Sequence, residues 1–195
     1  MRIFFTVLIL IFSIQSLVRA NDVEDFVIEN VSLGDSLIKH YSINEIESAQ
    51  KLKIVYPNNN FYDLQLDVKN FDIWPLLSFS IKKDDKKFKI HSIAGGKLID
   101  IDQCNIEKEK IIKDLKDTFF SELKENNYNF TYENITDGKS IAYISDFKLT
   151  NGSLRVYCTN WSKKTESELG YADNLRLEIG SLEYYDWLNT KAYKD

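Results

Sequence analysis

The 195-residue sequence contains few of the residues that mark specialised protein classes: two Cys, two Pro, two His and seven Gly. So little Pro and Gly excludes collagen-like and Pro-rich chains. Metal sites need clustered His, Cys or carboxylate ligands, and no such cluster is evident, so we expect no metal or cofactor. The 25 Lys and Arg residues do not outnumber the 30 Asp and Glu residues, and no basic patch stands out. We therefore expect no nucleic-acid partner.

Hydrophobic residues make up 44%, charged residues 28% and aromatic residues 13% of the chain. This composition is typical of a globular protein, and the length corresponds to one domain.

The N-terminal segment has the features of a secretory signal peptide. Arg2 provides a positive start, an apolar run follows from Ile3 to Phe12, and Val18-Arg19-Ala20 places small residues before a cleavage point. We expect residues 1–20 to be removed before Asn21, leaving a periplasmic or secreted protein. An uncleaved anchor helix is the alternative, but the apolar run is shorter than the roughly 20 residues that span a bilayer. No later segment is apolar enough, so we expect no membrane span after cleavage.

Alternating apolar and polar residues predict strands along most of the remaining chain. The predicted strands are 26–31, 62–68, 77–81, 88–94, 141–149, 154–158 and 175–179, the fourth of them ended by Gly95-Gly96. Short helices are predicted after Asp35 or Ser36, from the capping box at Ser42 to about Lys51, and after Ser181; a long helix is predicted over 105–126.

This order predicts an α+β fold in which one antiparallel sheet has helices packed on one side. Residues 21–195 are expected to form a single domain. Its halves, 21–103 and 104–195, would then be two α-βββ units, although no identity between them is evident.

Gly34-Asp35-Ser36-Leu37 spells the block after which the GDSL esterases are named. A serine nucleophile needs a base within hydrogen-bond reach, and that family supplies a histidine from D-x-x-H near its C-terminus. Here the last histidine is His91, and Phe88 stands three residues before it. We therefore interpret the block as a turn that opens a helix, predict no catalytic residue, and retain the esterase only as a second alternative.

The three Trp, eleven Tyr and twelve Phe residues could either fill the core or line a ligand groove. Trp161 is the hardest to assign to a core, because it follows a strand within a polar stretch. It is our candidate exposed aromatic.

The two cysteines, Cys104 and Cys158, are predicted to form a disulfide. Their number is even, no metal ligands are near them in the sequence, and export places the chain in an oxidising compartment. Two separate buried thiols are the alternative.

Several stretches resemble an exported protein family of Pelagibacter-type marine alphaproteobacteria. They are residues 31–38 followed by 42–46, the single Cys104 before the long helix, and 173–176 followed by Trp187-Leu188. This resemblance implies export and no particular activity. Gly34 and the helices after it are also similar to the fold of the outer-membrane assembly component BamE and the beta-lactamase inhibitor protein, although the lipid-modified Cys of BamE is missing.

Since no complete catalytic set is present, we expect a non-catalytic interaction or scaffold module of the bacterial cell envelope, with an unknown envelope protein as its partner. The alternative is a small-ligand-binding protein with an aromatic cleft. A filled core would favour the scaffold, and an open aromatic cleft would favour the binder.

Overall fold

The computed structural model describes residues 22–68, 71–119, 124–135 and 137–194. The predicted signal peptide, residues 1–20, therefore lies outside the described residues.

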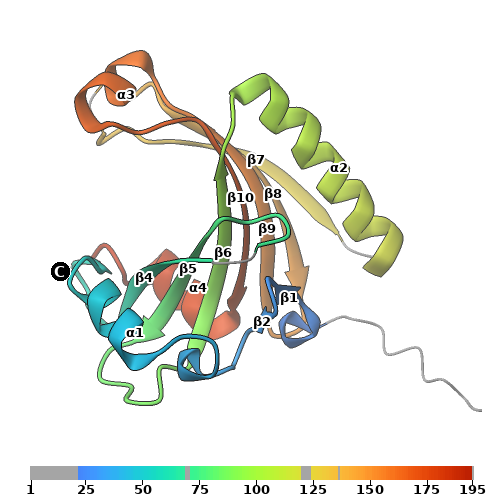
Figure 1. Ribbon diagram of the computed structural model, residues 1–195. Coiled ribbons are helices and arrows are strands. Elements are labelled where there is room, and N and C mark those ends of the chain that lie inside the picture. Colours follow the sequence, from blue (N-terminus) through green and yellow to red (C-terminus); the bar gives the residue numbers. More distant parts are fainter. Residues whose placement is uncertain (1–21, 69–70, 120–123, 136, 195) are drawn as a thin grey trace, which may run out of the picture.

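One eight-stranded antiparallel sheet dominates the structure (Figure 1), and the predicted α+β class with an antiparallel sheet is confirmed. The strand order is β3-β4-β5-β6-β10-β9-β8-β7. The strands are β3 (Ile54–Val55), β4 (Phe61–Asp67), β5 (Leu76–Lys82), β6 (Ile90–Leu98), β7 (Glu125–Thr131), β8 (Ile141–Leu149), β9 (Gly152–Asn160) and β10 (Asn174–Ser181). A separate two-stranded hairpin pairs β1 (Val27–Ile28) with β2 (Val31–Ser32).

The sheet consists of two four-stranded meanders, β3–β6 and β7–β10, which meet where β6 pairs with β10. Helix α1 (Ile43–Gln50) precedes the first meander and α2 (Ile101–Phe119) precedes the second, while α3 (Lys163–Leu169) lies between β9 and β10. The first meander thus has one strand more than the three that the sequence indicated, and the second has four, where the sequence indicated three or four. Two 3-10 helices, η1 (Val23–Asp25) and η2 (Leu37–Lys39), and the terminal α4 (Leu182–Thr190) complete the chain.

Local sequence signals account for most of these elements. The capping box at the start of α1 is present, because the Ser42 side chain accepts from the Glu45 N–H and the Glu45 side chain accepts from the Ser42 N–H. Ser181 caps α4 in the same way, by accepting from the Tyr184 N–H.

Three predictions about elements were wrong. Strand β6 does not end at Gly95-Gly96 but continues to Leu98, because the missing side chain of Gly95 leaves room for the Trp74 ring, which a Cβ would approach to 2.6 Å. The long helix is assigned only to Phe119, and β7 begins at Glu125, within the range predicted as helix. The predicted strand 26–31 is the β1–β2 hairpin, which turns at Glu29 and Asn30, both with positive φ.

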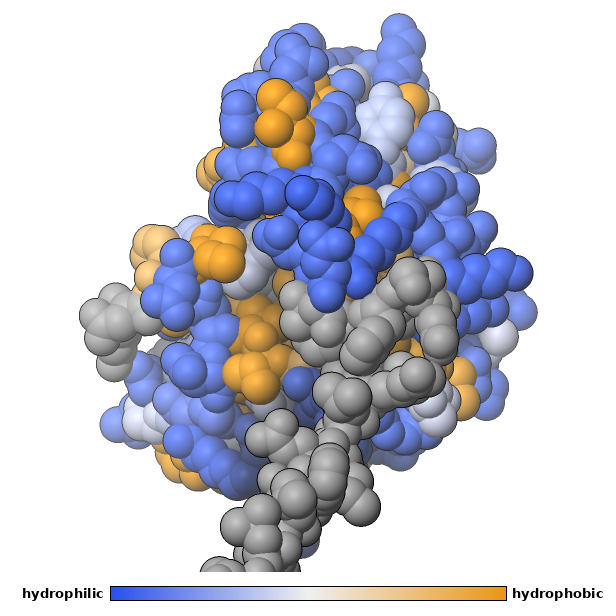
Figure 2. Space-filling model, turned by 90° about the vertical axis from the view of Figure 1, so that its right-hand side faces the viewer, coloured by the Kyte–Doolittle hydropathy of each residue, from blue (hydrophilic) through white to orange (hydrophobic). Residues whose placement is uncertain are grey.

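Helices α1 and α2 and the N-terminal segment cover one face of the sheet, as predicted. This face holds the main core, in which the side chains of Leu64, Phe79, Ile93, Leu154 and Leu175 are almost completely buried. The side of the molecule that carries α2 is mostly hydrophilic on its outside, with smaller hydrophobic groups between (Figure 2). The short α4 departs from this one-sided arrangement and packs on the opposite face, where Tyr184 and Trp187 contact Phe61 and Tyr185 belongs to the same cluster.

The predicted disulfide between Cys104 and Cys158 is present, with Cα atoms 5.9 Å apart. Cys104 lies in the first turn of α2 and Cys158 lies late in β9, and both are fully buried. The bridge therefore attaches the long helix to the centre of the second meander. None of the helices in the described ranges is both long and apolar enough to cross a membrane.

Candidate functional site: a groove on the second face of the sheet

The face of the sheet opposite α2 forms a groove. Alternate residues of all strands from β3 to β10 line two adjoining cavities, of about 490 Å³ and about 730 Å³. Because residues from both edges of the sheet line the same space, the sheet is bent around it. The loop carrying α3 stands at one end of this face, and α4 with the C-terminal segment stands at the other (Figure 1).

We call the smaller cavity the polar compartment and the larger one the aromatic compartment. The polar compartment is lined by hydroxyl and charged groups, among them Asp63, Ser78, Ser80, Ser92, Arg155 and Glu178. The aromatic compartment is lined mostly by rings and apolar side chains, among them Ile54, Leu76, Leu98, Trp161 and Tyr171. Tyr132, Tyr157 and Arg176 line both.

Small side chains on β5 and β6 leave the space for the groove. Ser78, Ser80, Ser92, Ala94 and Gly96 all project from this face, since successive residues of a strand point to opposite faces. The neighbouring strands carry larger groups in register, because Arg176 pairs with Gly96 and Glu178 with Ala94. The floor of the groove is therefore low on β5 and β6 and rises on β10 and β9.

Asp63 is an acid of the polar compartment whose carboxylate is hydrogen-bonded within the protein. Its two carboxylate oxygens accept hydrogen bonds from the Tyr56 hydroxyl and the Ser80 hydroxyl, each at 2.6 Å. Burial raises the pKa of Asp63, and the two hydrogen bonds oppose that shift.

Two further charged groups of the polar compartment have partners within the protein. The Glu178 carboxylate accepts from the Tyr157 hydroxyl at 3.3 Å and from the Tyr185 hydroxyl at 3.1 Å. Arg155 donates from Nε to Asp146 at 2.9 Å, and its guanidinium lies 4.1 Å from the centre of the Tyr185 ring. These groups form a network that holds the wall in one arrangement.

Arg176 differs from Arg155 because it has no carboxylate partner. Among the residues that the structure describes, no Asp or Glu oxygen lies within 4.0 Å of its guanidinium nitrogens. The side chain crosses Gly96, where a Cβ would be 3.5 Å from the Arg176 Nε. The Coulomb interaction with Tyr157 raises the pKa of Arg176 above its ordinary value, so the guanidinium is charged at any physiological pH.

Trp161 lies in the wall of the aromatic compartment. Its ring is between those of Tyr132 and Tyr171, with centroid distances of 4.7 Å to each. Expected as an exposed aromatic, Trp161 is instead half-buried, because these two rings cover part of it. Trp161 still lines the cavity.

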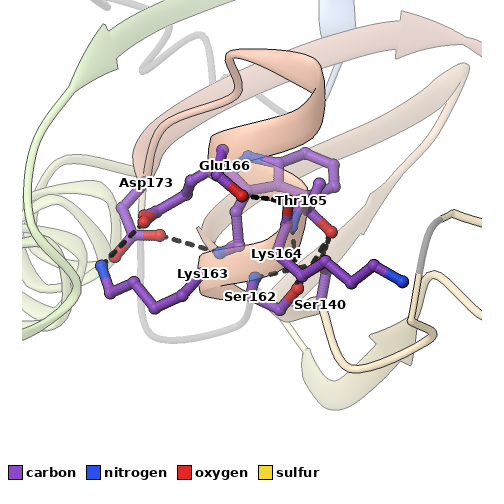
Figure 3. A network of polar contacts seen from close by, with 9 residues as sticks. Ser140, Ser162, Lys163, Lys164, Thr165, Glu166 and Asp173 are labelled. Carbon is purple, nitrogen blue, oxygen red and sulfur yellow. Dashed lines mark hydrogen bonds and ion pairs between the residues drawn. The ribbon is translucent and has the colours of Figure 1, made fainter.

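A polar network attaches the loop that carries Trp161 to the body of the protein (Figure 3). Ser162 caps α3 by accepting from the Thr165 N–H, while its own N–H donates to the Ser140 hydroxyl at 3.1 Å. The Ser140 hydroxyl donates to the Thr165 hydroxyl oxygen, and Asp173 accepts from the Trp161 N–H at 2.8 Å. These serines act as helix caps and as links between loops, and they fix the position of Trp161.

Ser36 does not contribute to the groove. It occupies the N-cap position of η2, but its hydroxyl donates to the Lys87 carbonyl at 2.5 Å instead of capping the helix. His40, the nearest histidine along the chain, has its Nε2 3.1 Å from an Asp35 carboxylate oxygen. Among the described residues, no group of three or more His, Cys, Asp or Glu side chains could hold a metal ion.

The sequence pointed to Trp161 but not to the rest of the site. The alternation of Leu175, Leu177 and Ile179 with Arg176 and Glu178 was a signal for charged groups on the second sheet face. What it could not show is that Tyr132 and Tyr157 lie beside them.

Comparison with known proteins gives no match, whether with family models, with curated proteins or with solved structures. The function of the groove must therefore be inferred from its own geometry and chemistry.

Proposed function

We propose that this protein binds a small organic molecule in the groove on the second face of its sheet. The observation that carries the proposal is a pair of adjoining cavities on one sheet face, which share Tyr132, Tyr157 and Arg176 and are together lined by every strand of the large sheet. Each compartment falls within the roughly 300–1,000 Å³ range of ligand pockets.

The lining of the groove supports this function. Rings and aliphatic side chains supply apolar contact area, which drives binding, while a few fixed polar groups supply orientation. The internal network of Glu178, Tyr157, Tyr185, Asp146 and Arg155 keeps the polar wall in place before a ligand arrives. A preorganised wall loses less conformational entropy on binding.

The location we propose is the periplasm or the extracellular space. The buried Cys104–Cys158 disulfide supports it, because such bonds persist mainly in oxidising compartments. A protein that binds small molecules there would act as a carrier or sensor without changing its ligand chemically.

An interaction or scaffold module of the envelope is the second candidate function. It is favoured by β7, which lies at one edge of the sheet and has six exposed residues out of seven. The free backbone groups of an edge strand can pair with an extended segment of a partner.

Fluorescence titration with the neutral apolar dye Nile red tests the groove. We expect saturable binding to the wild-type protein. Trp161→Ala should bind the dye at least about five-fold more weakly, because the variant removes ring contact area from the wall of the aromatic compartment. Gly96→Leu should also block binding, because the leucine side chain would occupy the space beside Arg176 in the aromatic compartment. Phe71→Ala is the matched control, because Phe71 is exposed but outside both compartments.

Absence of saturable dye binding would contradict the proposal. So would equal affinities for the wild-type protein, Trp161→Ala and Gly96→Leu, since the dye would then bind elsewhere.

A further inference from the structure

We infer that the ligand of the groove is an amphipathic anion, with a carboxylate, sulfonate or phosphate group bound to Arg176 and an apolar body in the aromatic compartment. This inference rests on the proposed function and specifies its ligand class. It is drawn from the charges of the groove and from the register of β5, β6 and β10.

The lack of a carboxylate against Arg176 among the described residues is the main observation; its guanidinium hydrogen-bonds Tyr157, and Glu178 attracts it only from beyond ion-pair distance. A half-buried cation has lost part of its hydration, and proteins ordinarily compensate this loss with a carboxylate. The neighbouring Arg155 has such a partner in Asp146, at 2.9 Å. Arg176 has none within 4.0 Å among the described residues, so its strongest complement would be an anion from outside the protein.

The one acid adjacent to Arg176 on the same strand face is engaged elsewhere. Glu178 lies two residues further along β10, and its two oxygens accept from the hydroxyls of Tyr157 and Tyr185. These hydrogen bonds hold the Glu178 carboxylate toward β9 and α4. The Arg176 side chain passes beside Gly96 on β6 and also hydrogen-bonds Tyr157, so Arg176 and Glu178 share a tyrosine partner without forming a direct ion pair.

This position places the cation beside the apolar wall. Leu76, Gly96 and Arg176 are in register across β5, β6 and β10, and all three line the aromatic compartment. Trp161 lines the same compartment. A guanidinium can donate two parallel hydrogen bonds to a planar anion, which would orient the anionic end at Arg176 while the remaining part of the ligand contacts the rings.

Three probes share a naphthalene ring and differ in charge, so they distinguish the contribution of the charge to affinity from that of the ring. They are 2-naphthoate, 2-naphthalenemethanol and 2-naphthylmethylammonium. Each is titrated into the full protein by calorimetry at neutral pH. We expect 2-naphthoate to bind at least about ten-fold more tightly than the alcohol, because a charge-assisted hydrogen bond in a partly buried site strengthens binding by about that factor. The ammonium probe should bind most weakly.

Arg176→Gln should remove the preference for the anion and leave the affinity for the alcohol within about two-fold. Arg176→Lys should retain part of the preference, since it keeps the charge without the bidentate geometry. Lys148→Gln is the control for net charge, because Lys148 is exposed and lines neither compartment. Nile red binding by Arg176→Gln shows that its groove is intact.

Equal affinities for naphthoate and the alcohol, or an unchanged preference in Arg176→Gln, would overturn the inference while leaving the groove as a binding site if Nile red still binds. A preference for the ammonium probe would assign the groove to cations through Glu178 and Asp63. If neither Nile red nor any probe binds, the proposed function itself fails.

Discussion

Breaking the disulfide between Cys104 and Cys158 should lower the free energy of unfolding by about 4 kcal/mol. The two cysteines are separated by 54 positions. In the chain-entropy model, closing a loop of that size restricts the unfolded chain by about this amount. Since domains of this kind are stable by only about 5–15 kcal/mol, the bridge supplies a large share of the total.

The position of the bridge explains why its loss would be felt across the molecule. Both cysteines are fully buried, and they join the first turn of α2 to the central strand β9. Without the bridge, α2 is held to the sheet mainly by a short apolar stripe that includes Ile112 and Leu115. We therefore expect the midpoint of thermal unfolding to fall by roughly 8–16 °C.

Urea unfolding of the oxidised and the reduced protein, followed by circular dichroism, measures the difference directly. The variant Cys104→Ala/Cys158→Ala is the control, because reductant should leave its unfolding curve unchanged. A loss of less than about 1 kcal/mol on reduction would refute the reasoning, since the unfolded chain would then be no freer without the bridge.

Three further predictions concern single residues. Partial burial raises the pKa of Glu29, but hydrogen bonds from the N–H groups of Asp72, Ile73 and Trp74 outweigh this effect and hold the pKa below its ordinary value of 4.5. The charged Glu29 carboxylate therefore stabilises the folded protein above pH 4.5, and this contribution to the free energy of unfolding is lost as the pH falls below that value. Acid titration of the free energy of unfolding should show a shallower decline for Glu29→Gln than for the wild type, and parallel curves would disprove the linkage. Gly152→Ala should destabilise the protein by roughly 3 kcal/mol, because the new Cβ would lie 2.0 Å from the Gly180 carbonyl oxygen, which is backbone and cannot turn away. Gly170→Ala, at a position with φ of 68° and open space around it, should cost only about 1 kcal/mol; urea midpoints that rank the two in the opposite order would contradict this.

The core side of the sheet could be predicted because its signals are local. Leu64 and Leu66 on β4, or Leu175 and Ile179 on β10, alternate with polar residues, and the period of two identifies the strands and their buried face. The capping box at Ser42 and the pair of cysteines are likewise short-range or compositional signals, and both features are present in the structure.

Elements without a buried face could not be predicted in this way. Strand β7 contains Asn126, Asn127 and Asn129 and is exposed along nearly all its length, so no hydrophobic period marks it. Its hydrogen bonds to β8 stabilise it, and that pairing is non-local. Gly95-Gly96 resembled the end of a strand because the reasons for these glycines, the Trp74 ring and the Arg176 side chain, come from other segments.

The groove depends entirely on the tertiary structure. Arg176, Trp161 and Leu76 come together only because β6 pairs with β10 and the sheet bends so that both edges approach one cavity. Whether Arg176 has a carboxylate partner depends on the position of every neighbouring acid, and only the folded structure sets those positions. The chain composition and periodicity therefore specified the core and the strands that face it, whereas the charge and shape of the binding face arose from the order and curvature of the folded sheet.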